Sequence, residues 1–412
     1  MKSKKNFNIT AAIFVGLVLG VLFGLFMPGR YEFLLPAVEL VSSVYMNALR
    51  MMIFPLVFCS LIVGIQGIGS VSATGRVGGQ AVLYYTATTL FASLLGLFLP
   101  KALGLGDGIS IEMVETNVEA TQFVSLMDTV KNLIPANPIA SFVSGDMLQV
   151  LVFAIIVGIA CLSLGEKAGP FVKVAEAVND ISIKIVSVVM YCTPVGVLCS
   201  IAAVIYANGV ETMLALGTVL VALYVTMFLY ALIVYGGLVK IIGKCGVRTF
   251  FVKVMPAALN AFGTCSSSAT LPISKRCADG LGVPNEISSL ALPLGATINM
   301  DAVSIVMSFM IVFFANACGV EVSFGMLVVV LLSNTLLSIG TPGVPGGAIA
   351  SFAALASIAG LPAGIMGVYI SVNTLCDMGA TCCNVLGDLA CSVAMKETVT
   401  LEGKQTAGSG RT

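Results

Sequence analysis

Histidine and tryptophan are both missing from this chain of 412 residues, and charged residues make up only 10% of it. Without histidine the chain has no imidazole metal ligand, no histidine proton relay, and no Ser/His or Cys/His catalytic pair. The 20 Lys and Arg residues balance 20 Asp and Glu residues, so there is no sign of the basic surface that nucleic-acid binding requires. These absences argue against a hydrolase and against DNA or RNA as a partner.

Cysteine is also too sparse for a disulfide framework, because most of the 12 Cys residues lie in apolar runs without CxxC spacing. We interpret them as small buried thiols; Cys382, Cys383 and the nearby Cys376 are a weak metal pattern without histidine. What the sequence has in excess is apolar residues, at 58%, well above the roughly half of soluble domains. This excess indicates a protein embedded in the lipid bilayer.

Six apolar runs in the first part of the chain approach or exceed the length of about 20 residues that a membrane-spanning helix needs. They occupy residues 8–27, 34–68, 78–99, 139–164, 181–206 and 213–242. Lys and Arg collect in the connections that would share one side of the membrane. This asymmetry predicts that both termini are cytoplasmic.

Beyond residue 249, small, polar and helix-breaking residues interrupt the apolar segments at CSSSATLP (265–272) and SIGTPGVPGG (338–347). We expect both segments to enter the membrane and return. Irregular backbone at membrane depth needs protein or a water-filled cavity around it, so two such tips predict a site between them. A long apolar run follows each, at residues 287–317 and 363–395. Since the first segment starts from the cytoplasm and a spanning helix separates it from the second, we expect the second to enter from outside, and such an inverted repeat is typical of secondary transporters.

Polar residues in the last run recur every three or four positions and therefore share one helix face. They are Asn373, Asp377, Ala380 or Thr381, Asn384 and Asp388. A structural hydrogen-bond network is the plain interpretation, but mid-membrane carboxylates cost several kcal/mol unless they face a cation or a polar interior. With Asp301 in the preceding run, we favour a cation or substrate site, and its hard oxygen ligands suit Na⁺.

Four segments carry a family resemblance: SSSATLP (266–272), LPLGATINMD (292–301), GVPGG (343–347) and DMGATCCNVLGD (377–388). They resemble the signatures of the dicarboxylate/amino acid:cation symporter family, which includes glutamate transporters and neutral amino acid exchangers. The resemblance implies an all-α membrane protein with eight transmembrane helices and two re-entrant helical hairpins in inverted repeats. It further implies a glutamate-transporter-like elevator fold and a homotrimer.

The same resemblance divides the chain into scaffold and transport segments. Residues 1–75 would form scaffold helices 1 and 2, residues 76–104 helix 3 of the transport domain, and residues 105–206 an external loop with scaffold helices 4 and 5. Residues 207–248 would form helix 6 of the transport domain. Residues 249–412 would form the transport core, with hairpin 1, helix 7, hairpin 2, helix 8 and the C-terminal tail.

Three Na⁺ sites are implied by the resemblance, with Na⁺ as a co-transported ion and no organic cofactor. The first would use carbonyl oxygens and one carboxylate, from Gly295, Asn299, Asn384 and Asp388. The second would use mostly backbone oxygens, from Thr297, Met300, Ser338 and Thr341. The third would use Tyr85, Thr88, Thr89, Asn299 and Asp301.

For the substrate, the resemblance places the α-carboxylate near Ser267, Val344 and the Asn384 side chain, and the α-amino group at Asp377. The implied substrate-binding set is Ser266, Ser267, Ser268, Thr341, Val344, Asp377, Ala380, Thr381 and Asn384.

Departures from the family pattern narrow the range of expected substrates. Acidic-substrate members place an Arg where this chain has Ala380, so that a guanidinium fork receives the side-chain carboxylate. No Arg or Lys occurs between Arg276 and Lys396, and an unpaired second carboxylate would be costly to bury. We therefore expect a small neutral amino acid such as serine, alanine, threonine or cysteine, although a larger pocket for a branched or sulfur-containing side chain stays open. Met307 replaces a Glu of proton- and K⁺-coupled relatives, which favours Na⁺ coupling without K⁺ countertransport.

The expected function is a Na⁺-coupled symporter of small neutral L-amino acids in the cytoplasmic membrane, and not an enzyme. One alternative is a symporter of acidic amino acids or dicarboxylates. An alternative of another class is an ion channel whose flux does not depend on substrate. A membrane enzyme is the weakest alternative, because no His or Lys base is placed to activate the serines.

Overall fold

The computed structural model describes residues 9–27, 32–73, 76–107, 134–144, 146–341, 343 and 345–399. Every element in these ranges is a helix, and they contain no strand. Five described stretches are long and apolar enough to cross a membrane: Val77–Ala102, Gln149–Val186, Leu214–Ile241, Asn285–Ala317 and Ile365–Thr398. The prediction of an all-α membrane protein is confirmed.

The helices before residue 193 are α1 (Ile9–Phe26), η1 (Glu32–Leu34), α2 (Leu35–Arg50), α3 (Ile53–Ala73), α4 (Arg76–Ala102), α6 (Pro138–Ser144), α7 (Met147–Leu164), η2 (Gly165–Ala168), α8 (Gly169–Val189) and η3 (Met190–Cys192). Those that follow are α9 (Thr193–Tyr230), the π-helix η4 (Ala231–Tyr235), α10 (Gly236–Ile241), α11 (Val247–Thr264), α12 (Ser267–Gly280), α13 (Asn285–Ile298), α14 (Asp301–Ala317), α15 (Phe324–Gly340), α16 (Ala348–Ile358) and α17 (Ile365–Thr398).

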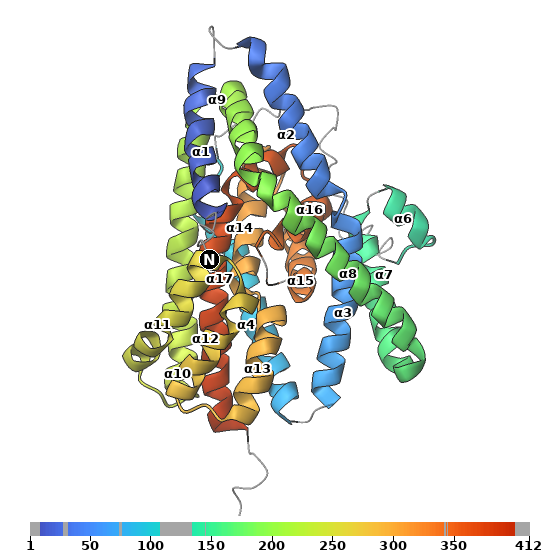
Figure 1. The fold of residues 1–412 in the computed structure, drawn as a ribbon, viewed down its shortest axis with the longest axis vertical. Helices are drawn as coiled ribbons and strands as arrows, with labels where there is room; N and C mark the ends of the chain where they lie inside the picture. Colours follow the sequence, from blue (N-terminus) through green and yellow to red (C-terminus); the bar gives the residue numbers. More distant parts are fainter. Residues whose placement is uncertain are drawn as a thin grey trace, which may run out of the picture.

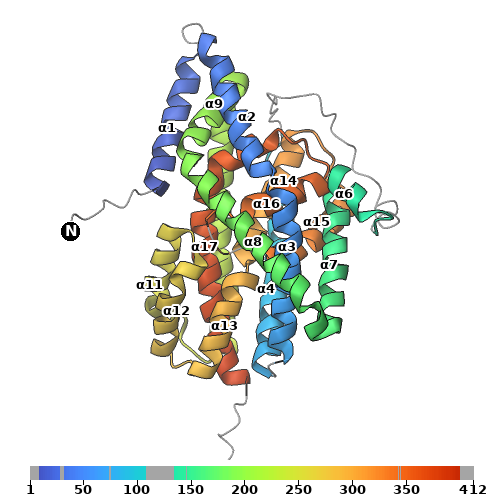
Figure 2. The same cartoon turned by 45° about the vertical axis from the view of Figure 1, so that its right-hand side comes forward.

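Glycines spaced four residues apart set the packing of α1 against the first part of α9. A Cβ atom added at Gly20 would lie 2.7 Å from the Leu198 carbonyl oxygen, and one at Gly24 would lie 2.9 Å from that of Ala202. Small residues at this spacing let two membrane helices approach closely and gain van der Waals contact, which matters where lipid is as apolar as the side chains. Figures 1 and 2 show α1, α2 and this part of α9 together at one end of the molecule.

The centre of the molecule is built from α14 and α17. Helix α14 is buried along nearly its whole length and packs on α4, α15 and α17. Helix α17 runs lengthwise through the molecule, with α11 and α12 on one side and α13 on another (Figure 2). By contrast, α9 and α4 leave many large apolar side chains exposed, as expected of helices that face lipid or another subunit.

Both interrupted segments form a pair of packed helices with an irregular tip. Helices α11 and α12 contact each other and are joined only by Cys265 and Ser266, of which Cys265 is in the left-handed region with φ 49°. Helices α15 and α16 also contact each other, and residues 341–347 connect them. The two helix pairs agree with the predicted hairpins, whereas their entry from opposite sides of a membrane stays a prediction.

Some helix boundaries differ from the hydropathy runs. The run at residues 181–206 is divided, because α8 ends at Val189 and Pro194 lies in the first turn of α9, where proline fits a helix well. Helix α9 then continues to Tyr230, so no break separates it from the run that was expected to start at residue 213. The last run has polar residues but no break, since α17 is continuous. Residues 108–133, which include most of the external loop expected after residue 104, lie outside the described residues.

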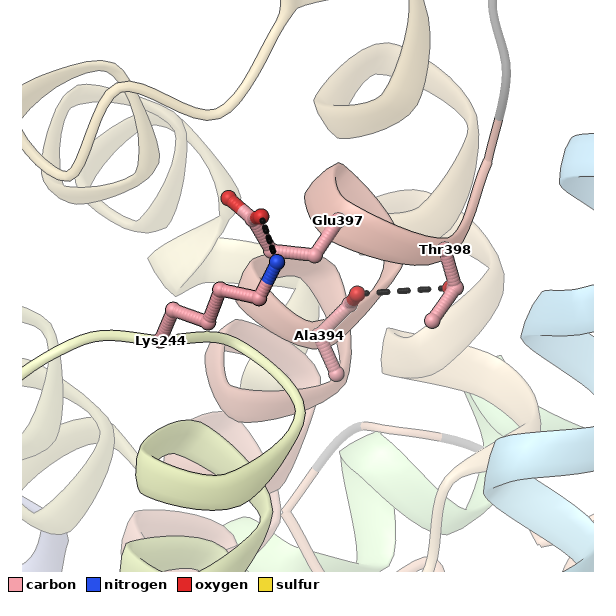
Figure 3. Close-up of polar contacts among 4 residues, drawn as sticks. All are labelled: Lys244, Ala394, Glu397 and Thr398. Atoms are coloured by element: carbon pink, nitrogen blue, oxygen red, sulfur yellow. Dashed lines mark hydrogen bonds and ion pairs between the residues drawn. The ribbon is translucent and has the colours of Figure 1, made fainter.

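One end of the molecule gathers lysines from segments far apart in the sequence. Lys244 Nζ, before α11, lies 3.4 Å from Glu397 Oε2 near the end of α17, where Thr398 Oγ1 also donates to the Ala394 carbonyl (Figure 3). Lys396 Nζ donates to the Leu281 carbonyl between α12 and α13. The sidedness of the connections, and the side of a membrane that this end faces, stay predictions.

Candidate substrate and cation site

An interrupted helix provides the backbone of the site. Helix α13 ends at Ile298 and α14 begins at Asp301, so Asn299 and Met300 break one long apolar stretch. Their backbones are non-helical, with φ/ψ of −82°/83° and −110°/43°. Carbonyl groups at the end of α13 therefore lack regular helical partners. Asn299 is 0% exposed, so these groups can bind only something that enters the protein interior.

Asn299, Asn384 and Asp388 form one polar group beside this break. Asn299 Nδ2 donates to Asp388 Oδ1 at 2.8 Å and to the Asn384 carbonyl at 3.3 Å. Asn384 Oδ1 accepts a hydrogen bond of 2.8 Å from the N–H of Ala302 at the start of α14. A Cβ atom at Gly295 would clash with the Asp388 carboxylate, so only glycine allows this approach.

Asn299 Oδ1 is buried and has no hydrogen-bond partner among the described residues. A buried acceptor without a partner is costly and needs an explanation such as an ion or a water molecule. Next to a carboxylate and to freed carbonyl groups, an amide oxygen is a hard ligand of the type that Na⁺ and Ca²⁺ prefer. The residues of the first predicted Na⁺ site therefore fit a cation.

Asp301 is the centre of a second polar group, and it is 0% exposed. Thr88 and Thr89 of α4 donate to its Oδ1 at 3.1 and 2.7 Å. Tyr235 donates to its Oδ2 at 2.8 Å, and the Tyr230 hydroxyl lies 3.3 Å from the same oxygen. The structure thus brings Asp301 together with two predicted threonine ligands. The two tyrosines were missed by the sequence reasoning, which looked for helical spacing and not for a π-helix.

Tyr85 and Asn373 are two further residues that the sequence singled out, and the structure places both in the protein interior. Tyr85 is buried and donates from its hydroxyl to the Ala291 carbonyl at 2.9 Å, so it ties α4 to α13 next to the Asp388 group. Asn373 is buried in α17, on the face that carries the polar stripe.

A small pocket lies between the two hairpin tips, the helix break and α17. It is lined by Cys265, Ser267, Met300, Val303, Thr341, Gly343, Ala348, Asp377, Thr381 and Asn384. Asp377 Oδ2 accepts from the Gly346 N–H at 3.1 Å, and its Oδ1 accepts from Thr381 Oγ1 at 3.2 Å. The pocket therefore has a carboxylate and an amide, and its lining, among the residues that the structure describes, includes no Lys or Arg.

The two tips contact each other at this pocket. Ser266 Oγ donates to the Gly343 carbonyl at 3.2 Å and caps α12 by accepting from the Ala269 N–H. Thr341 Oγ1 lies 2.7 Å from Ser351 Oγ and donates to the Leu337 carbonyl, while Ser338 Oγ donates to the Thr335 carbonyl. The hydroxyls of Ser338 and Thr341, two of the four residues of the predicted second site, are thus engaged within their own hairpin, which leaves their backbone oxygens as the ligands to consider.

Four predicted residues are placed differently or lie beyond what the structure describes. Ser268 is exposed on α12, and Thr297 is exposed on α13, where its hydroxyl donates to the Leu294 carbonyl. Ala380 is 1% exposed and is not among the residues that line the pocket; its neighbour Thr381 is. Val344 lies outside the described residues. Their roles stay predictions.

The charge of the site is negative. Asp301, Asp377 and Asp388 receive hydrogen bonds from hydroxyls, an amide and a backbone N–H, and none of these partners is a basic side chain. Across the described residues, no cluster of three His, Cys, Asp or Glu side chains could hold a metal ion, so a cation here would depend on carbonyl, amide and hydroxyl oxygens beside single carboxylates. Uncompensated carboxylates in a membrane interior favour the entry of cations.

Nearly the whole chain, residues 9–398, matches the sequence pattern of a single family. The chain belongs to the sodium:dicarboxylate symporter family. Na⁺ is accordingly the ion that this symporter carries with its substrate, as the sequence resemblance implied. The two groups around Asp388 and Asp301 are the parts of the symporter that suit such an ion.

Curated relatives of this symporter have names that refer to acidic substrates. The proton/sodium-glutamate symport protein of Geobacillus stearothermophilus is 25% identical over 403 residues, which is 95% of each chain. The proton/sodium-glutamate symport protein of Bacillus subtilis is 28% identical over 402 residues, 95% of this chain and 93% of its own. The C4-dicarboxylate transport protein 2 of Ralstonia nicotianae is 29% identical over 397 residues, 93% of this chain and 87% of its own.

Proposed function

We propose that this symporter carries small neutral L-amino acids, such as serine, with Na⁺. The observation that carries the proposal is the lining of the pocket, which combines Asp377 and Asn384 with small and apolar side chains and has no basic residue. A neutral amino acid has one ammonium and one carboxylate. Asp377 would pair with the ammonium, and Asn384 with Ser267 and the hairpin tips would receive the carboxylate.

A second carboxylate on the substrate would lack a partner in this pocket. Burying an ionised carboxylate without a cation is costly, so glutamate or aspartate should bind weakly. A simple dicarboxylate would also place a negative group near Asp377, which offers no donor of its own when ionised. The charge of the pocket therefore supports a neutral cargo with an amino group.

Cations would enter before the substrate in the proposed cycle. Na⁺ would bind at the groups around Asp301 and Asp388 and reduce the negative charge beside the pocket. Ordering of the break at Asn299 and Met300 would then shape the substrate site, since Asn384 bonds to Asn299 within that break and to Ala302 just after it. We further propose an elevator movement of the hairpin domain, a homotrimeric assembly and a cytoplasmic membrane location with both termini inside.

A second candidate function is the symport of acidic amino acids or dicarboxylates, and the names of the relatives favour it. Those relatives are no more than 29% identical, and specificity rests on few side chains. The two candidates make opposite predictions for competition between substrates.

Substrate binding by the purified protein distinguishes these candidates. In NaCl, serine or alanine should raise the unfolding temperature and displace labelled serine, whereas aspartate, glutamate and succinate should do neither at the same concentrations. In choline chloride, serine should have little effect. Stabilisation by aspartate or succinate but not by serine would contradict the neutral cargo and support the second candidate.

A further inference from the structure

Tyr230 and Tyr235 converge on one oxygen of Asp301 although they are five residues apart. In an α-helix, five residues turn by about 500°, which would leave the two side chains roughly 140° apart. They meet here because Ala231–Tyr235 is a π-helix, in which the Gly236 N–H donates to the Ala231 carbonyl five residues earlier. Such segments are rare and are frequent at functional sites.

The two oxygens of the Asp301 carboxylate are held by different helices. Thr88 and Thr89 of α4 donate to Oδ1, and the two tyrosines approach Oδ2. Tyr230 lies closer to the Thr88 carbonyl, at 2.8 Å, than to Asp301, at 3.3 Å. Because a phenol has one proton to donate, Tyr235 is the main donor to Oδ2.

We propose that Tyr235, supported by Tyr230, is a positioning residue of the cation site at Asp301. It fixes Oδ2, so that Oδ1 stays directed toward Thr88 and Thr89, where the ion is received. A threonine hydroxyl can rotate and offer a lone pair to a cation, while the phenol keeps Oδ2 paired. The inference rests on the proposed role of Asp301 as a Na⁺ ligand.

The surroundings of the tyrosines are built to hold them in place. Both rings are buried, and they pack edge to face with centroids 5.2 Å apart. A Cβ atom added at Gly387 of α17 would lie 2.6 Å from the Tyr235 hydroxyl. Glycine at this position therefore leaves the space that the hydroxyl occupies beside Asp301.

The test uses Tyr235→Phe, Tyr230→Phe and a matched control in the full-length purified protein. The control is Tyr369→Phe, because the Tyr369 hydroxyl is buried and has no hydrogen-bond partner among the described residues. The unfolding temperature is measured as NaCl replaces choline chloride, with total chloride constant and no substrate present. The Na⁺ concentration that gives half of the full stabilisation reports cation affinity, whatever the substrate is. Li⁺ is titrated in the same way.

Tyr235→Phe should raise the half-saturating Na⁺ concentration by about tenfold, because the freed carboxylate must be ordered when the ion binds. Tyr230→Phe should raise the half-saturating Na⁺ concentration by only about threefold, because the Tyr230 hydroxyl is bonded mainly to the Thr88 carbonyl. The ratio of the Na⁺ to the Li⁺ value should change in Tyr235→Phe, and Tyr369→Phe should match the wild type in every measurement. Substrate affinity at saturating Na⁺ should be unchanged in all three.

Two outcomes would overturn the inference. One is a half-saturating Na⁺ concentration in Tyr235→Phe that equals that of the wild type, and the other is an increase of this concentration in Tyr369→Phe as large as that in Tyr235→Phe. If Tyr235→Phe does not fold, a Tyr230→Phe protein with an unchanged Na⁺ value is the contradicting result. Asp301→Asn separates this inference from the proposed site. If that variant keeps wild-type Na⁺ stabilisation, the role of Asp301 is wrong; if it loses it and Tyr235→Phe does not change, only the role of the tyrosine is wrong.

Discussion

Gly387→Ala perturbs both carboxylate groups through one methyl group. The added Cβ would lie 2.6 Å from the Tyr235 hydroxyl and 2.8 Å from Asn299 Nδ2. Tyr235 holds Asp301, and Asn299 holds Asp388, so both side chains must shift away from their carboxylates. Gly387 thus lies at the point where the two groups meet.

The magnitude follows from two opposing effects. Ala is more favourable than Gly inside a helix by up to about 1 kcal/mol. Overpacking a filled interior costs about 1–3 kcal/mol, and a weakened hydrogen bond to a charged group adds to that cost. Gly367→Ala, on the same helix, is the matched control, because its Cβ would meet nothing within 4 Å. Gly387→Ala should therefore be less stable than Gly367→Ala by about 1–3 kcal/mol.

Thermal unfolding of both variants in detergent, with and without Na⁺, measures this difference. Stabilisation by Na⁺ should be reduced in Gly387→Ala and retained in Gly367→Ala. Equal unfolding temperatures and equal Na⁺ responses in the two variants would refute the described packing at Gly387.

Three further predictions test other parts of the site. Asp377→Asn should weaken serine binding by at least about tenfold, the value of one hydrogen bond to a charged group, without loss of Na⁺ stabilisation; unchanged serine affinity in a displacement assay would place the ammonium partner elsewhere. Ser266→Ala removes both a helix cap and the contact between the tips, so the unfolding free energy should fall by about 1 kcal/mol and substrate release should become faster; unchanged stability and release would mean that the tip contact contributes nothing. Lys244→Ala removes an exposed ion pair (Figure 3) and should change the free energy of unfolding by less than about 1 kcal/mol, with wild-type serine binding. A larger loss of stability would contradict the small contribution expected of this ion pair.

Hydropathy and periodicity predict the features of this fold that follow from local composition. Gly, Pro and Ser mark the two tips, and the polar spacing in α17 predicts the face on which Asp377, Asn384 and Asp388 lie. The apolar run at residues 287–317 also contains the polar residues Thr297, Asn299 and Asp301, and the helix break at Asn299 and Met300 lies among them. These features depend on the chemistry of neighbouring residues, which a single sequence contains.

Other features depend on tertiary contacts that local patterns do not encode. The π-helix Ala231–Tyr235, which brings Tyr230 and Tyr235 to the same oxygen of Asp301, has no signature in the apolar run ALIVY. The exposure of Ser268 and the burial of Ala380 outside the pocket lining depend on the exact start of α12 and the rotation of α17. Residue spacing in the sequence shows which residues share a helix face, but it does not show which neighbouring helix that face contacts.

Uptake of radiolabelled serine into proteoliposomes tests the central claim most directly. With an inward Na⁺ gradient, the protein should accumulate serine above the level reached with choline, and excess unlabelled alanine should suppress uptake while aspartate and succinate should not. Uptake that is equal in choline and Na⁺, or that only aspartate or succinate suppresses, would contradict Na⁺-coupled transport of a neutral amino acid.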